Sequence, residues 1–331
     1  MLTVKKASPF GFVLVAIVVA EVIVLMPSKR IDESQPTGFA TPREEVNLSI
    51  VGFHAVNLDA DGRRGTVDAK EAEVYKEKGF ALLKDVDAKI YSKGDNTIRI
   101  RAQEGKYYLD KKDIEFFRDV IATSENLGYE FKTNTLKYED GPKILSTDDQ
   151  VWISGPNPKD PSLEVRAQGL RGNTKTEEFS LLKDVRCKKH DVGAPSMEID
   201  SDKADVFLNK NEALFKENVV VRQKEMNIFT EHFLVTYNSR DKAIEKAKAF
   251  DVVKIVQGDR VATCQKAFIL NKEQKIVMTG HPKVVQGEDV VEGKIVIFFT
   301  KENKILFDEA VGEVKSLGEG SPTQGKMDFT Q

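Results

Sequence analysis

The residue types that most often carry chemistry are few in this chain, and they do not form a catalytic or metal-binding set. The 331 residues include two cysteines and four histidines. Cys187 lies three residues before His190, which is at most half of a zinc site. Cys187 and Cys264 could pair in an oxidising compartment, but two separate thiols in strands are favoured. We therefore expect no metal site.

The other motifs with chemical potential fail in their spacing. Asp59-Ala-Asp61-Gly62 begins like a calcium loop, but position 12 of that loop would be Lys70, so a hairpin turn is favoured. The chain has no Gly-x-Ser-x-Gly nucleophile elbow and no phosphate-binding loop. Its 53 acidic residues show no carboxylate pair at a distinctive spacing. The sequence therefore predicts a protein that is not an enzyme and needs no cofactor.

The composition is that of a soluble domain. Hydrophobic residues make up 40% and charged residues 31%, which is too polar for a protein with many membrane spans. The formal net charge is −3, so there is no basic excess of the kind that binds a phosphate backbone. We therefore expect no nucleic-acid partner.

One apolar segment stands near the N-terminus. The 17 residues from Phe10 to Met26 are apolar except for Glu21. A helix of this length is just long enough to span a thin bilayer. An uncleaved anchor is favoured over a signal peptide, because no small-x-small exit follows the segment. Glu21 is either a tolerated acid or a contact with polar groups of neighbouring transmembrane helices. The predicted order is a cytoplasmic stub at 1–9, a transmembrane helix at 10–27 and a tether at 28–45.

The rest of the chain predicts β-strands that repeat. Ile98 to Ala102 alternates apolar and basic residues, as a half-buried strand does. The run Leu-Leu-Lys-Asp-Val at 82–86 recurs as 116–120 and 181–185, and more loosely as 214–219. A period of about 29–34 residues suits two strands and two turns. Stacking such units predicts an all-β, elongated, curved structure of two stacked sheets, with about sixteen strands and one long apolar interior. A right-handed β-helix is the alternative, although its Gly and Asn ladders are absent.

Punctuation divides this region into two halves. The segment from Asp191 to Pro195 is typical of a boundary, and the last residues are rich in Gly, Ser and Pro. We expect one domain at 46–192, a second at 193–315 and a disordered tail at 316–331.

In the first half, the stub, anchor and tether precede a series of positions: Asp61-Gly62, Ala69, Ala72, Tyr75, Ile100-Arg-Ala102, Gly105, Tyr107, Phe131, Thr133, Leu136, Tyr138 and Gly155-Pro156. This arrangement resembles the family of LptC, the inner-membrane-anchored component of lipopolysaccharide export. The resemblance covers roughly residues 5–190.

The second half carries another series of positions: 244–253, Ala262, Ala267, 276–284 and Val291-Glu-Gly293-x-Ile295. Over roughly residues 195–315 it resembles the LptA/OstA repeat, the soluble periplasmic bridge of the same pathway. LptA is ordinarily a separate chain, so this fusion departs from the usual pattern.

This resemblance implies a function and partners. Such proteins form an open β-jelly-roll bridge along which an LptB, LptF and LptG transporter pushes lipopolysaccharide from the inner membrane. It implies an amino terminus in the cytoplasm and the bulk of the chain in the periplasm. It also implies edge-to-edge joining, with the N-terminal edge on the transporter. The C-terminal edge strand, with Ile305, Phe307 and Val311, would meet an LptA-like unit or the outer-membrane receptor LptD.

A lipid groove would be lined by the inward apolar positions of the strands. The sequence leaves open that these residues are plain core. It also leaves open a membrane-anchored β-repeat scaffold with a dry, closed interior, or a β-helix enzyme that acts on polysaccharide. The candidate groove residues are Ile98, Ile100, Phe116, Val120, Phe131, Leu136, Tyr138, Phe179, Leu181, Val185, Phe215, Val219, Phe233, Val235, Ile276, Met278, Ile295 and Ile297.

Overall fold

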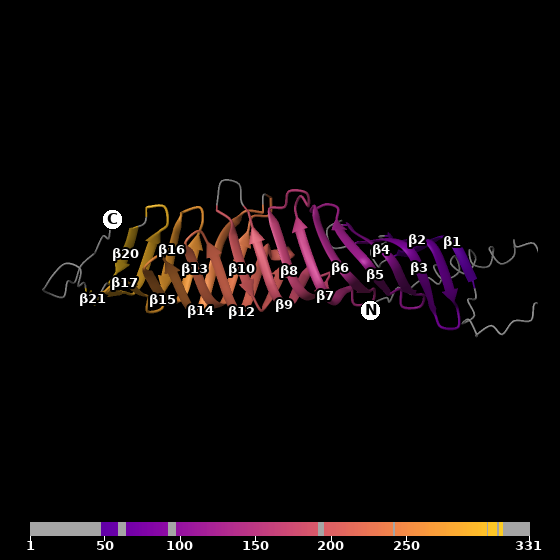
Figure 1. The fold of residues 1–331 in the computed structure, drawn as a ribbon. Helices are drawn as coiled ribbons and strands as arrows, with labels where there is room; N and C mark the ends of the chain where they lie inside the picture. The colour runs from indigo at the N-terminus through magenta and orange to yellow at the C-terminus, as the bar shows by residue number, and fades with distance from the viewer. Residues whose placement is uncertain are drawn as a thin grey trace, which may run out of the picture. The chain divides into compact units, whose positions relative to one another are not determined.

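The all-β prediction is confirmed by a computed structural model of the chain. The structure describes residues 48–58, 64–91, 97–190, 195–240, 242–302, 304–309 and 311–313. Within these ranges lie one short 3-10 helix, η2 (Leu208–Lys210), and the strands of a single 21-stranded sheet (Figure 1). The predicted stub, transmembrane segment with Glu21, tether and tail fall outside the described residues. Among the residues that are described, no helix is long and apolar enough to span a bilayer.

The long strands each span 11 to 14 residues, and they dominate the N-terminal half. In chain order the strands are β1 (Leu48–Leu58), β2 (Arg64–Tyr75), β3 (Phe80–Tyr91), β4 (Thr97–Tyr108), β5 (Ile114–Ser124), β6 (Tyr129–Glu139), β7 (Ile144–Gly155), β8 (Leu163–Asn173), β9 (Glu178–Lys189), β10 (Met197–Ser201), β11 (Lys203–Phe207), β12 (Glu212–Gln223), β13 (Met226–Tyr237), β14 (Ile244–Gln257), β15 (Arg260–Leu270), β16 (Lys275–Thr279), β17 (Lys283–Gln286), β18 (Asp289–Glu292), β19 (Ile295–Phe299), β20 (Lys304–Asp308) and β21 (Val311–Glu313).

Each strand pairs antiparallel with the strand position that precedes or follows it along the chain. β10 and β11 together fill one position between β9 and β12. β16 and β17 likewise share the position beside β15, and their partners β19 and β18 share the next. β20 and β21 share the last position. The sequence predicts about sixteen strands, and the larger number arises because these four positions are each broken in two.

The long strands bend in the middle, and the repeated sequence motif marks the bend. In β3 the buried residues Leu83 and Val86 are separated by two exposed residues, Lys84 and Asp85. Asp85 has φ 51°, in the left-handed region that Asp and Asn tolerate better than most residues. Asp119, Asp184, Asn218 and Asp251 take the same conformation in β5, β9, β12 and β14. Such a bulge keeps both halves of the strand apolar on one face while the backbone turns.

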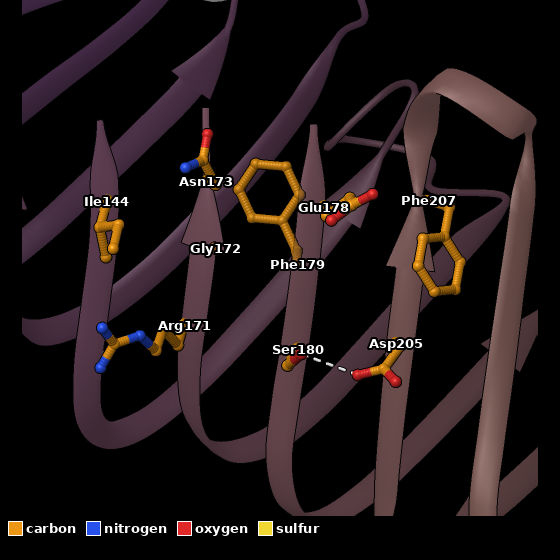
Figure 2. Close-up of a pocket in the computed structure, with 9 residues that line it drawn as sticks. All are labelled: Ile144, Arg171, Gly172, Asn173, Glu178, Phe179, Ser180, Asp205 and Phe207. Carbon is orange, nitrogen blue, oxygen red and sulfur yellow. Dashed lines mark hydrogen bonds between the residues drawn. The ribbon is translucent and has the colours of Figure 1, made fainter. Parts of the chain in front are cut away.

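The bends fold the sheet into two layers, and the strands of Figure 2 curve through them. We call layer A the layer that contains β11, β16, β19 and β20, and layer B the layer that contains β10, β17, β18 and β21. Each long strand contributes one half to each layer. The apolar core lies on the inner face between the layers, which fits the predicted jelly roll. The β-helix alternative is wrong, because every registered strand pair is antiparallel.

Candidate functional site

The candidate site is the inner face of the folded sheet. Residues that are paired across neighbouring strands lie on the same face of the sheet, so the strand register shows which predicted residues share the inner face. Ile100 lies opposite Ala88 and Ala122, and Phe116 lies opposite Gly105 and Leu136. Phe116 and Phe233 are wholly inaccessible to solvent, each with an exposed fraction of 0%. The alternation that the sequence shows therefore corresponds to burial between the two layers.

Sixteen of the eighteen predicted groove residues lie on this face. Three of them, Ile98, Phe131 and Phe179, are half-buried near strand ends and pack on the core from its margin. The thirteen fully buried members are Ile100, Phe116, Val120, Leu136, Tyr138, Leu181, Val185, Phe215, Val219, Phe233, Val235, Ile276 and Met278. The sequence did not single out several other large buried side chains, such as Leu83, Ile114 and Ile228.

Two predicted residues, Ile295 and Ile297, lie on the opposite face, so their assignment to the inner wall was wrong. The buried pair Ile276 and Met278 lies opposite Phe298 and Val296, which are themselves buried. Because side chains alternate along a strand, Ile295 and Ile297 point outward. All five residues of β19 are apolar, so alternation within the strand could not reveal its inner face.

The widest gap in the strand ladder behind the inner face lies between β6 and β7. The backbone ladder skips Thr133 to Leu136 on β6 and Thr147 to Val151 on β7. Thr133 and Thr147 are buried there, with their hydroxyl oxygens 3.5 Å apart. Thr147 Oγ1 also accepts a hydrogen bond from the Asp149 backbone N–H at 3.1 Å. Polar side chains therefore occupy the bend where the neighbouring strands carry apolar ones.

This interruption separates two apolar clusters. The N-terminal cluster contains buried residues from Val67 to Leu145, and the C-terminal cluster contains those from Val151 to Phe307. Phe131 packs against both of them. The division lies within the first half of the sheet, so the C-terminal cluster runs without a break through the 193 boundary that the sequence predicts.

A cavity of about 340 Å³ lies at the margin of layer A where β7, β8, β9 and β11 meet (Figure 2). Its inner-face members are Gly172 and Phe179. The Phe179 ring lies where a Gly172 side chain would begin, since a Cβ built there would be 2.0 Å from Phe179 Cδ1. The remaining lining residues come from outer-face rows: Ile144, Arg171, Asn173, Glu178, Ser180, Asp205 and Phe207. The cavity is therefore mainly a feature of the outer face.

The buried thiols do not form a reactive site. Cys187 and Cys264 are free and lie on the inner face of layer B. Burial raises the pKa of Cys187 to about 12 and that of Cys264 to about 11. A protonated, buried thiol is a poor nucleophile and a poor metal ligand. Over the described ranges, no group of three His, Cys, Asp or Glu side chains is placed to hold a metal ion.

The two ends of the sheet present single-sided strands. β1 pairs only with β2 among the described strands, and β20 and β21 pair only with β19 and β18. Ile305 and Phe307 in β20 are buried, whereas Val311 in β21 is exposed. Each end therefore presents a strand that is paired on one side only among the described strands.

Two known protein families match this chain, one in each half. The family described as "Lipopolysaccharide-assembly, LptC-related" matches residues 12–191. The family described as "LptA/(LptD N-terminal domain) LPS transport protein" matches residues 198–304. A search among curated proteins finds no match.

One solved structure with a similar trace is LptH, described as the LptA homologous periplasmic component of the lipopolysaccharide transport device from Pseudomonas aeruginosa. The identity is 14%, the match covers 41% of this chain and 94% of LptH, and the TM-score is 0.32. A likeness at this level is too low to support a fold by itself.

The all-β architecture and the two consecutive family matches define a bridge protein of lipopolysaccharide transport, a class without enzymatic activity. The chain belongs to the LptC-related lipopolysaccharide-assembly family and continues directly into an LptA/LptD N-terminal unit. The fusion that the sequence predicts is thereby confirmed.

Proposed function

We propose that this chain is an inner-membrane-anchored periplasmic bridge that holds lipopolysaccharide acyl chains against its inner face. Residues 10–27 would be the anchor, with the amino terminus in the cytoplasm. The LptB, LptF and LptG transporter would supply the cargo, and the chain would pass it towards the outer membrane. The observation that carries the proposal is the single apolar cluster from Val151 to Phe307, which runs through the junction between the two family units.

The physical need for such a surface follows from the cargo. An acyl chain exposed to water costs about 0.8 kcal/mol for each CH₂ group. A continuous apolar face removes most of this cost at every step, whereas a gap between two separate proteins would have to be closed. In this chain the joint between the two units is covalent, and β9 pairs directly with β10 and β11.

The residues at the margin of the inner face are the proposed first contacts. The central residues, such as Phe116 and Phe233, already pack fully between the layers. An acyl chain would therefore reach the interior by parting the layers from the side where the strands end. Ile98, Phe131 and Phe179 lie at that margin and are only half-buried.

The proposed partners at the two ends follow from the single-sided strands. The N-terminal edge at β1 would pair with the transporter's periplasmic domains. The C-terminal edge at β20 and β21 would pair with an LptA-like unit or with LptD. Strand addition of this kind uses backbone hydrogen bonds for affinity, so it needs little sequence complementarity.

Photo-crosslinking in cells tests the cargo contact. A photoreactive amino acid is placed at Phe131 or Phe179 on the inner face, and at the adjacent outer positions Lys132 or Ser180 as matched controls. We expect adducts that an antibody to lipopolysaccharide detects at the inner positions and not at the outer ones. Absent adducts at Phe131 and Phe179, or equal adducts on both faces, would contradict the proposal.

A second experiment tests the anchor and its orientation. A C-terminal alkaline phosphatase fusion should be active, because that enzyme requires the periplasm, and the fusion should sediment with inner membranes. Deletion of residues 10–27 should release it from the membrane fraction. An inactive fusion that still accumulates would contradict the proposed orientation.

A further inference from the structure

The outer face of layer A changes its chemistry along one register row. In β2 to β7 that row consists of Glu73, Leu82, Lys106, Glu115, Lys137 and Ser146. The row continues through Arg171, Ser180 and Asp205. From β12 to β20 it becomes apolar, with Leu214, Leu234, Phe268, Val277, Ile297 and Leu306. Lys248 alone interrupts it, between Leu234 and Phe268.

Lysines flank this apolar row on both sides. Two more outer rows run beside the apolar row, two residues to either side of it along each strand. From β12 to β20 these three rows together contain Lys216, Lys246, Lys248, Lys266, Lys275 and Lys304. Only two carboxylates, Glu212 and Asp308, share these rows, which leaves a formal excess of four positive charges. The chain as a whole has a net charge of −3, so positive charge is concentrated on this face.

Several of these lysines are available to an external partner. Lys246, Lys248 and Lys266 form no ion pair with any described residue, whereas Lys216 pairs with Asp205 and Lys275 with Glu273. The Lys248 ammonium lies 5.1 Å from the Phe250 ring centroid and 5.6 Å from that of Phe268. Its stem thus covers apolar surface while its charge stays at the surface.

This combination fits the surface of an anionic bilayer. Aliphatic and aromatic side chains can enter the headgroup region while the surrounding ammonium groups meet lipid phosphates. A second copy of this face is disfavoured, because it would set lysines against lysines. An acidic protein would need a pocket for each apolar side chain, whereas lipids adapt to the row.

We propose that the outer face of layer A from β12 to β20 is a docking surface for an anionic phospholipid membrane. This surface lies on the face opposite the inner apolar cluster. A chain that carries no lipopolysaccharide would still dock, so the inference goes beyond the proposed function and can fail independently of it.

Vesicle flotation tests this proposal. The full chain, held in nanodiscs of neutral phosphatidylcholine, is mixed with vesicles of 70% phosphatidylcholine and 30% phosphatidylglycerol, or of phosphatidylcholine alone. We expect co-flotation with the anionic vesicles only, and its loss in 0.5 M NaCl. The triple variant Lys246→Gln, Lys248→Gln, Lys266→Gln should lower the partition coefficient at least tenfold.

The matched control also removes three lysine charges, but from the N-terminal half of the same outer face. Lys84→Gln, Lys106→Gln, Lys137→Gln should leave co-flotation unchanged. Both triple variants should keep the β-sheet circular dichroism of the parent chain, since all six lysines lie on the outer face. Equal loss in both variants, or equal binding to neutral vesicles, would overturn the proposal. Two further results would also overturn the proposal, if the Lys246, Lys248 and Lys266 variant abolished them. One is self-association of the chain, and the other is binding to polyglutamate without binding to vesicles.

Discussion

Along the outer face of layer A, the strands from β2 to β7 carry mostly charged and polar side chains. At the same register height the strands from β12 to β20 carry leucine, valine, isoleucine or phenylalanine, except for Lys248 in β14. The inner faces of the two halves do not differ in this way, since Phe116 and Phe233 are equally buried in equivalent positions. The shared inner face reflects the common need to bury one side of the sheet. The outer face is free to vary, so differences between the halves in partners should be sought there.

The apolar interior is also divided along the chain. The apolar cluster of the C-terminal half extends into the N-terminal half as far as Val151, and it ends at the buried threonines of β6 and β7. The boundary between family units therefore does not coincide with the boundary between cores. The two apolar clusters therefore meet inside the LptC-related unit and not at the joint between the two units.

The largest expected effect contrasts the two faces of β13. Phe233→Ala should lower the free energy of unfolding by about 3–5 kcal/mol, because it leaves a cavity at a wholly buried site. Leu234→Ala, one residue away on the outer face, should cost about 1 kcal/mol or less. Urea denaturation followed by circular dichroism measures both. Equal losses would show that the outer row is packed as tightly as the inner one.

The next effect concerns the polar interruption. Thr147→Val should cost about 1–3 kcal/mol, because it leaves the Asp149 N–H without its hydroxyl acceptor. Thr133→Val should cost less, since the hydrogen bond between the Thr133 and Thr147 hydroxyl groups is long, at 3.5 Å. A double variant near the parent stability would indicate that the two clusters can merge. If Thr147→Val were itself neutral, the interruption would have no energetic meaning.

The bend offers a test in which the two halves should behave alike. Asp85→Val in β3 and Asp184→Val in β9 should each cost about 1–2 kcal/mol, because a β-branched residue is strained at φ 51°. Asp251→Val in β14, at φ 80°, should show a cost of similar size. The corresponding glycine variants should be close to neutral. A cost in one half only would mean that the repeated motif performs different roles.

The smallest effect is a pH dependence in layer B. Burial raises the pKa of Cys187 from 9.0 to about 12, although nearby Lys189 opposes the rise. A raised folded-state pKa means that this stabilisation is complete below pH 9 and is lost as the pH rises towards 12. Between pH 7 and 9.5 the parent should lose about 1 kcal/mol more stability than Cys187→Val. Parallel pH profiles of parent and variant would contradict the buried position.

Much of the fold was predictable from local signals. Period-2 alternation in runs such as 98–102 predicts half-buried strands, and the Leu-Leu-Lys-Asp-Val repeats predict stacked units. Within those repeats Asp85, Asp119 and Asp184 mark bends, a signal that the sequence contained but that strand patterns alone did not explain. Alternation failed at β19, where Ile295 and Ile297 are as apolar as Val296 and Phe298.

The sequence by itself determined that this is an all-β chain of repeated strands, related to two families of one transport pathway. Those properties reside in short patterns and in residue types, which exist before the chain folds. Only the tertiary structure decided which face of β19 points inward, where the apolar clusters divide, and that six lysines from five strands gather around one outer apolar row. These properties depend on the register between strands, which arises from backbone pairing between residues far apart in the chain.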